Sequence, residues 1–171
     1  VKKAVRIGKP IAINLSFGNT YGAHDGTSLL ERFIDNVAEI GRSVICVGSG
    51  NEGAAAGHVS GSIFQDTNEQ VPVDRTQLNV GEYQQSFGVQ LWKEYVDRFR
   101  VSLRSPAGER RQIDTIQPGK QVFTLEKTTI LLYLGEPAPY SVNQEIYFDF
   151  IPVERYVTPG IWTFEIEAVE T

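Results

Sequence analysis

Residues 10–18, PIAINLSFG, are the most informative segment of the first third of the chain. It opens with a nearly continuous apolar run that is too short for a helix and has no polar alternation. We therefore expect a buried strand over residues 10–16. Residues 17–26 contain three glycines and break all periodicity, which predicts a loop at the C-terminal end of that strand.

An amphipathic helix is expected directly after this loop. Ser28 and Glu31 stand at the spacing of a capping box. Apolar residues then follow at intervals of three and four as far as Gly41, which can adopt the left-handed conformation that ends a helix. Residues 44–47, VICV, are again wholly apolar and lead into GSGNEG, residues 48–53. Two buried strands around one helix predict a right-handed parallel β-α-β unit.

The pattern changes after about residue 59, where period-two alternation dominates. Residues 65–79 are polar and predict a linker or an irregular connection. Beyond them, alternating runs separated by proline and glycine turns predict antiparallel strands near residues 87–91, 99–103, 122–125, 129–134, 146–150 and 162–166. We therefore expect an α/β fragment at residues 1–58, an antiparallel β-sandwich or jelly roll at 59–171, and a mainly β fold overall.

Composition limits the classes of function. The formal net charge of −5 argues against nucleic acid or an anionic membrane as a partner. No apolar run approaches the ~20 residues that span a bilayer. Cys46, the single cysteine, excludes an internal disulfide framework, and we expect it to be a small core residue. Neither His24 nor His58 has metal-ligating neighbours in the sequence, so no metal or other cofactor is expected.

The glycine pattern Gly48-x-Gly50-x-x-Gly53 formally matches a dinucleotide-binding fingerprint. That motif needs an apolar helix directly after the glycines, because the helix N-terminus holds the pyrophosphate. Residues 54–62, AAAGHVSGS, do not form such a helix pattern. The sequence therefore argues against a nucleotide site.

The segment INLSFG, residues 13–18, followed across one helix by GNEG, residues 50–53, resembles the central part of the subtilisin-like serine peptidases (subtilases). The resemblance covers residues 10 to about 58. It implies that one wall of a substrate cleft is formed by the main chain of Ser16, Phe17 and Gly18. It implies that the other wall, at the primary specificity pocket, is formed by Gly48, Ser49 and Gly50.

The same resemblance gives Asn51 a catalytic role. Its side-chain amide would donate a hydrogen bond to the oxyanion of the tetrahedral intermediate. A neutral amide suits that role because it stabilises developing negative charge without adding a titrating group. Taken alone, a Gly-Asn-Glu-Gly segment would favour an ordinary turn residue at Asn51.

The chain also departs from the subtilase pattern. It contains no His-Gly-Thr-His segment and no Gly-Thr-Ser-x-Ala nucleophile segment. Because subtilases order their triad Asp, His, Ser, we expect Asp and His before Val1 and Ser after Thr171. The start at Val1 without methionine fits an internal piece of a longer protein. The β-rich second part resembles the jelly-roll insert of clostridial subtilases, including the spore-germination group, and residues 160–164 are similar to its closing strand.

The resemblance thus implies an internal fragment of a serine endopeptidase that is inactive alone. Its partners would be a peptide or protein substrate and the remainder of the protease domain. The chain carries no signal for its location, and the resemblance would fit a secreted or spore-associated protein. Two alternatives stay open: a non-catalytic β-sandwich that binds a protein or glycan, and a pseudoprotease whose triad is mutated.

Two side-chain groups in the second part bear on these alternatives. A carbohydrate platform would use exposed aromatic residues, although aromatic residues in sandwiches more often lie in the core. The candidates are Trp92, Tyr95, Tyr133, Tyr140 and Trp162. A basic cluster predicts the solvent face of a strand pair, neutralised by nearby acidic residues. Its members are Arg98, Arg100, Arg104, Arg110 and Arg111.

Overall fold

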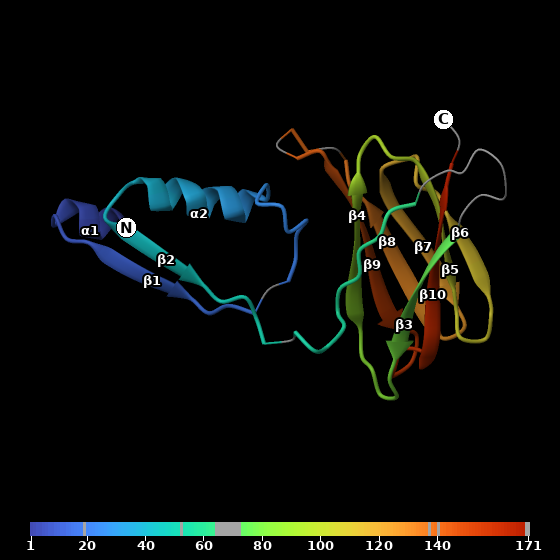
Figure 1. Ribbon diagram of the computed structural model, residues 1–171. Coiled ribbons are helices and arrows are strands. Elements are labelled where there is room, and N and C mark those ends of the chain that lie inside the picture. The colour runs from blue at the N-terminus through green and yellow to red at the C-terminus, as the bar shows by residue number, and fades with distance from the viewer. Residues whose placement is uncertain (19, 52, 64–72, 137, 140, 170–171) are drawn as a thin grey trace. The chain divides into compact units, whose positions relative to one another are not determined.

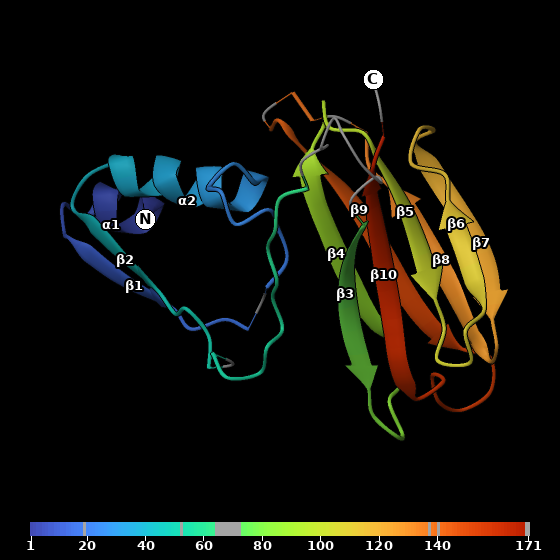
Figure 2. The same cartoon turned by 45° about the vertical axis from the view of Figure 1, so that its right-hand side comes forward.

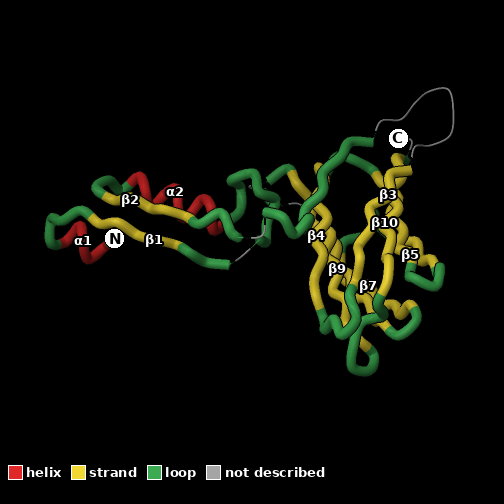
Figure 3. Tube along the Cα trace, turned by 60° about the horizontal axis from the view of Figure 1, so that its bottom comes forward, coloured by secondary structure: helices red, strands yellow, loops and turns green. Residues whose placement is uncertain are grey.

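A computed structural model of the chain describes residues 1–18, 20–51, 53–63, 73–136, 138–139 and 141–169. The chain divides into two compact units, Val1–His58 and Val59–Thr171. The described part is mainly β, and its helices all belong to the first unit (Figure 3). Expectations for Glu52, Tyr140 and residues 65–72 fall outside the described residues.

The first unit contains the predicted strand, helix and strand (Figure 1). Its elements are α1 Lys2–Arg6, β1 Ile11–Leu15, α2 Leu29–Glu39 and β2 Ser43–Val47. The two strands pair in parallel, in a register that sets Ile11 opposite Ser43 and Leu15 opposite Val47. The short helix α1 was not predicted, because five residues give too little periodicity to recognise.

Helix α2 begins and ends as its sequence predicts. The Ser28 hydroxyl accepts a hydrogen bond from the Glu31 amide at 3.2 Å, and the Glu31 carboxylate accepts one from the Ser28 amide at 3.0 Å. These hydrogen bonds from Ser28 hold the pKa of Glu31 below its usual value. Gly41 follows the helix with a φ of +79°, and its amide donates to the carbonyl of Ala38. The capping box and the glycine stop are thus both confirmed.

The prediction that β1 and β2 are buried is wrong within this chain. Helix α2 covers one face of the strand pair, where the Ser43 hydroxyl donates to the carbonyls of Val37 and Ala38 and Ile45 is half-buried. The opposite face carries Val44, which is 61% exposed, and Cys46, which is exposed and not a core residue. A single helix can cover only one face of two strands, whereas their apolar sequences suit strands covered on both faces.

The second unit is an antiparallel sandwich of two four-stranded sheets (Figure 2). One sheet has the order β3-β10-β5-β6 and the other β4-β9-β8-β7. The strands are β3 Val73–Val80, β4 Phe87–Glu94, β5 Phe99–Arg104, β6 Arg110–Ile113, β7 Gly119–Leu125, β8 Thr128–Leu134, β9 Asn143–Pro152 and β10 Gly160–Ala168. The antiparallel sandwich is therefore confirmed. The predicted linker over residues 65–79 is wrong from residue 73 onwards, because β3 occupies that part.

The core of the sandwich is built from aromatic and branched side chains on the inner faces of both sheets. Phe150 on β9 stacks on Phe87 and meets the ring of Trp162 edge-on, with centroids 4.7 and 5.3 Å apart. Trp162 is fully buried, and its indole N–H donates to the Thr158 carbonyl at 2.9 Å. Trp162 is therefore a core residue and cannot belong to a carbohydrate platform.

The prediction that the basic cluster forms the solvent face of a strand pair is confirmed for three of its arginines. Arg100, Arg104 and Arg110 occupy β5 and β6 on the outer face of their sheet, as predicted, and their acidic partners come from β10. Glu165 is 7% exposed and accepts a hydrogen bond from Arg110 Nε at 2.8 Å. Arg111 instead sets its guanidinium carbon 5.8 Å from the centre of the Phe123 ring. Burial alone would raise the pKa of Glu165, but the hydrogen bonds and charges of Arg110 and Arg104 outweigh it and lower that pKa.

The lowered pKa of Glu165 predicts an acid-sensitive contribution to stability. That contribution is complete above the ordinary carboxyl pKa of 4.5 and is lost as the pH falls through the lower folded-state value. Glu165→Gln should destabilise the chain by about 1–3 kcal/mol near neutral pH, because the arginine donors lose the charged acceptor that this buried carboxylate provides. Urea unfolding between pH 7 and pH 3 measures this. The matched control is Glu154→Gln, at a carboxylate that is 70% exposed; equal pH profiles for the two variants would contradict the prediction.

Candidate active-site cleft

The two predicted cleft walls start at the same edge of the β1–β2 pair. Leu15 and Val47 are the last residues of the parallel strands and stand opposite each other. Beyond them, the Gly48 amide donates to the Leu15 carbonyl at 3.1 Å. A Cβ atom added to Gly48 would lie 3.6 Å from Ser16 Cα. The structure therefore brings Ser16 and Gly48 side by side, at the strand ends where α/β sheets usually bind ligands.

The first wall is anchored through a side-chain pair at its start. Asn14 Nδ2 donates to Ser16 Oγ at 2.9 Å, and the serine hydroxyl can donate back to Asn14 Oδ1 at 3.3 Å. Phe17 is 79% exposed, and Gly18 is exposed as well. Both residues of this wall that follow Ser16 are therefore exposed to solvent.

The second wall turns away from the strand direction after Gly48. Ser49, Gly50 and Asn51 are exposed, and Gly50 has a φ of +88°. That conformation strains a residue with a side chain, so the turn accounts for glycine at position 50. An added Cβ at position 48 would make only ordinary contacts, so packing within this chain does not account for Gly48. Asn51 lies in a bend three residues beyond the contact with Ser16.

His24 and His58, at which no metal site is expected, lie near each other in the first unit. The rings of His24 and His58 are roughly parallel, with centroids 6.3 Å apart. The Nε2 atom of His24 lies 2.9 Å from the Thr20 carbonyl oxygen. Asp25 accepts hydrogen bonds from the amide and hydroxyl of Thr27, in the turn that precedes the helix cap at Ser28. This contact was not predictable, because the two histidines lie far apart in the sequence.

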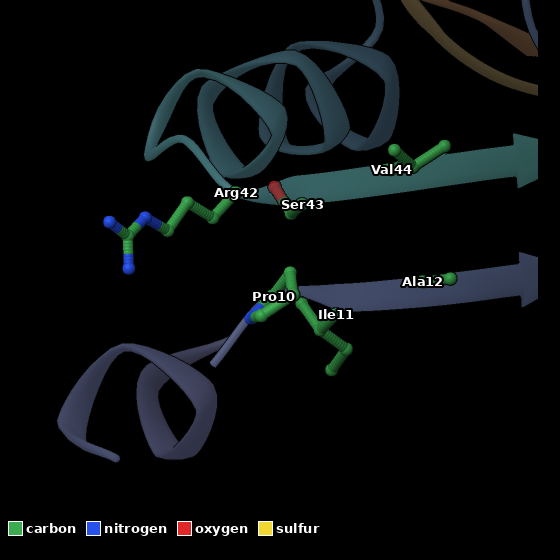
Figure 4. A pocket seen from close by; sticks show the side chains of 6 residues that line it. All are labelled: Pro10, Ile11, Ala12, Arg42, Ser43 and Val44. Carbon is green, nitrogen blue, oxygen red and sulfur yellow. The ribbon is translucent and has the colours of Figure 1, made fainter. Parts of the chain in front are cut away.

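Two hollows of the first unit lie away from the predicted cleft walls. Figure 4 shows one of them at the opposite end of the strand pair, where β1 and β2 begin. It is lined by Pro10, Ile11, Ala12, Arg42, Ser43 and Val44. The polar side chain of Arg42 is directed to the Gly8 carbonyl at 3.3 Å. This end of a parallel pair is not where ligands usually bind, so we assign the hollow no site.

The described residues contain neither a metal-binding cluster nor a membrane-spanning helix. Within the described ranges, no three histidine, cysteine, aspartate or glutamate side chains gather in a way that could hold a metal ion. No helix among the described residues combines the length and apolar character needed to cross a membrane.

Comparison with solved structures identifies the fold. The chain is similar to the CspB protease of Clostridium perfringens, with a TM-score of 0.83 and 24% sequence identity. The match covers 99% of this chain and 34% of that protein, so the chain spans about a third of its length. No protein-family model matches the chain, and no curated protein sequence matches it. The β-α-β unit and the antiparallel sandwich therefore occur together in the fold of a clostridial protease.

Proposed function

We propose that the chain is an internal part of a subtilisin-like serine endopeptidase. Residues 1–58 would be part of the catalytic core, and residues 59–171 would be an inserted jelly-roll domain. The observation that carries the proposal is the juxtaposition of Ser16 and Gly48 at one edge of a parallel strand pair. The likeness in fold to the CspB protease supports it over nearly the whole chain.

In this proposal the substrate peptide lies extended between the two walls. Ser16, Phe17 and Gly18 pair with its backbone, and Gly48, Ser49 and Gly50 border the pocket for the side chain before the scissile bond. The Asn51 amide stabilises the oxyanion that forms when the catalytic serine attacks. The triad itself lies outside these residues, so the chain alone does not hydrolyse peptides.

The first unit exposes apolar side chains, as expected if it is only part of a protease domain. Leu29, Leu30 and Phe33 on α2 are exposed, as is Val44 on the uncovered strand face. Apolar surface of this extent is costly in water and marks a binding surface. In the proposal, the rest of the protease domain covers it by adding strands and helices, and no nucleic acid or membrane is required.

Labelling by a fluorophosphonate probe tests the proposal, because the probe reacts with an activated serine. We expect the full-length protein to be labelled and the chain of residues 1–171 to remain unlabelled, since it lacks the nucleophile. Heat-unfolded full-length protein serves as the control for nonspecific reaction. A folded full-length protein that is not labelled would contradict the peptidase proposal and favour a pseudoprotease or a sandwich that acts only in binding.

A further inference from the structure

The outer face of the β3-β10-β5-β6 sheet carries a cluster of arginines that the peptidase proposal does not use. We call it the arginine face, and its members are Arg75, Arg100, Arg104 and Arg110. Strand register sets Arg75 and Ser102 on either side of Glu165, and Arg100 beside Glu167. Figure 2 shows the four strands side by side. The cluster is therefore continuous across the whole sheet.

Two glutamates of β10 hold these arginines in place. Glu165 contacts Arg75 at 3.5 Å, Arg104 at 3.4 Å and Arg110 at 2.8 Å, and Glu167 contacts Arg100 at 3.1 Å. The glutamates are 7% and 17% exposed, whereas the arginines are 40–66% exposed. The acidic groups thus lie underneath, and the guanidinium groups face solvent in fixed positions. Such preorganisation lowers the entropic cost of binding a partner.

The arginine face carries more positive charge than its own glutamates neutralise. Four arginines against two glutamates leave two positive charges in surplus, on a chain whose formal net charge is −5. Arg104 and Arg110 stand directly opposite each other on β5 and β6, an arrangement in which like charges repel. Glu165 contacts both arginines and offsets part of this repulsion, and a further anion placed over the pair would offset more of it.

An unsatisfied hydroxyl lies in the middle of the same face. Ser102 occupies the β5 position between Glu165 and Gln112 in the strand register. It is 1% exposed, and its Oγ has no hydrogen-bond partner in the described part of the chain. A buried hydroxyl without a partner costs free energy. Binding that shifts the exposed ends of the arginine side chains would let a carboxylate oxygen supply the missing acceptor.

We propose that the arginine face binds an acidic polypeptide segment. Guanidinium groups match carboxylates in a two-pronged geometry. The face spans about 14 Å across four strands and about 13 Å along β5 from Arg100 to Arg104, by ordinary strand spacings. That area suits a few residues of extended chain. A long nucleic acid would extend beyond the arginines over a unit whose remaining charge is predominantly acidic, which favours a short acidic segment as the occupant.

Fluorescence anisotropy with a labelled peptide of six glutamates tests this inference on the whole chain. We expect binding that weakens with added salt and no binding of the matched peptide of six glutamines. Arg75→Gln combined with Arg100→Gln should weaken binding about tenfold. Both residues are the more exposed members of the face, and Glu165 keeps Arg104 and Arg110, so the variant should fold. Lys120→Gln combined with Lys127→Gln is the control of equal charge change outside the face.

A second variant is expected to strengthen binding of the glutamate peptide instead of weakening it. Glu167→Gln removes negative charge from the face and should tighten binding about threefold. The inference fails if the glutamate peptide does not bind, or if the arginine and lysine double variants lose affinity equally. It also fails if a single-stranded oligonucleotide or a sulfated oligosaccharide of equal charge binds as tightly through the same arginines. Self-association that is abolished by the arginine variant would identify a second copy of the chain as the occupant and overturn the acidic segment.

Discussion

Trp162→Ala should lower the free energy of unfolding of the sandwich by about 3–5 kcal/mol, the usual cost of truncating a large buried aromatic residue. Trp162 is fully buried, and its ring meets Phe150 edge-on across the two sheets. Its removal would leave a cavity between the sheets and deprive the Thr158 carbonyl of its donor. Because small domains have only about 5–15 kcal/mol of stability, much of the margin would be lost. Urea unfolding followed by circular dichroism measures the change.

Two further variants separate the contributions to this loss. Trp162→Phe keeps an aromatic ring but removes the indole N–H, so it should cost less than alanine by about 2 kcal/mol. Ile161→Ala changes the neighbouring residue on the outer face, where the side chain is 43% exposed, and should cost under about 1 kcal/mol. An alanine at position 162 that costs no more than one at position 161 would show that the sandwich core does not depend on Trp162.

The order of the elements in the first unit was predictable because its signals are local. The capping box at Ser28 and the stop at Gly41 lie within one helix length, and their geometry was confirmed. Burial was not predictable from the same residues. The apolar run at β2 indicates what the strand prefers to contact, but which face is covered depends on other segments. Cys46 is exposed here for that reason.

In the second unit, too, local patterns predicted strands but did not predict contacts with residues distant in the sequence. Strands with strict alternation, such as β9 and β10, were predicted, whereas β3 was missed because few of its residues are apolar. The inward-facing Lys93 was also missed. Its ammonium group donates to the carbonyls of Glu94 and Asp97 at 3.0 and 2.7 Å, and burial lowers its pKa. Local sequence does not reveal that backbone carbonyls would accept hydrogen bonds from this ammonium group.

The candidate cleft was predictable only in part. Its walls follow two parallel strands, and parallel strands end at the same edge, so the contact between Ser16 and Gly48 follows from topology once the β-α-β unit is recognised. The role of Asn51 does not follow in the same way. An oxyanion donor is defined by its distance from the carbonyl oxygen of the scissile bond, which is an atom of the substrate. The function of Asn51 therefore needs a kinetic test.

Asn51→Ala in the full-length protein should lower kcat for peptide hydrolysis roughly 10²–10³-fold, the usual effect of removing one oxyanion donor. KM should change little, because the oxyanion exists only in the transition state. Asn51→Asp should lower kcat further, since a carboxylate would repel the developing negative charge. Hydrolysis of a chromogenic peptide gives both constants, and the rate of fluorophosphonate labelling gives an independent measure of serine reactivity.

The control for these variants must alter an asparagine that lies outside the cleft. Asn36 is exposed in the middle of α2, and Asn36→Ala should leave kcat within about twofold, because it touches neither wall. Thermal unfolding of all variants separates lost catalysis from lost structure. A stable Asn51→Ala protein that hydrolyses peptide at the original rate would reduce this asparagine to a turn residue. A rise in KM at constant kcat would place Asn51 in substrate binding, because the lost interaction would then act equally on ground state and transition state.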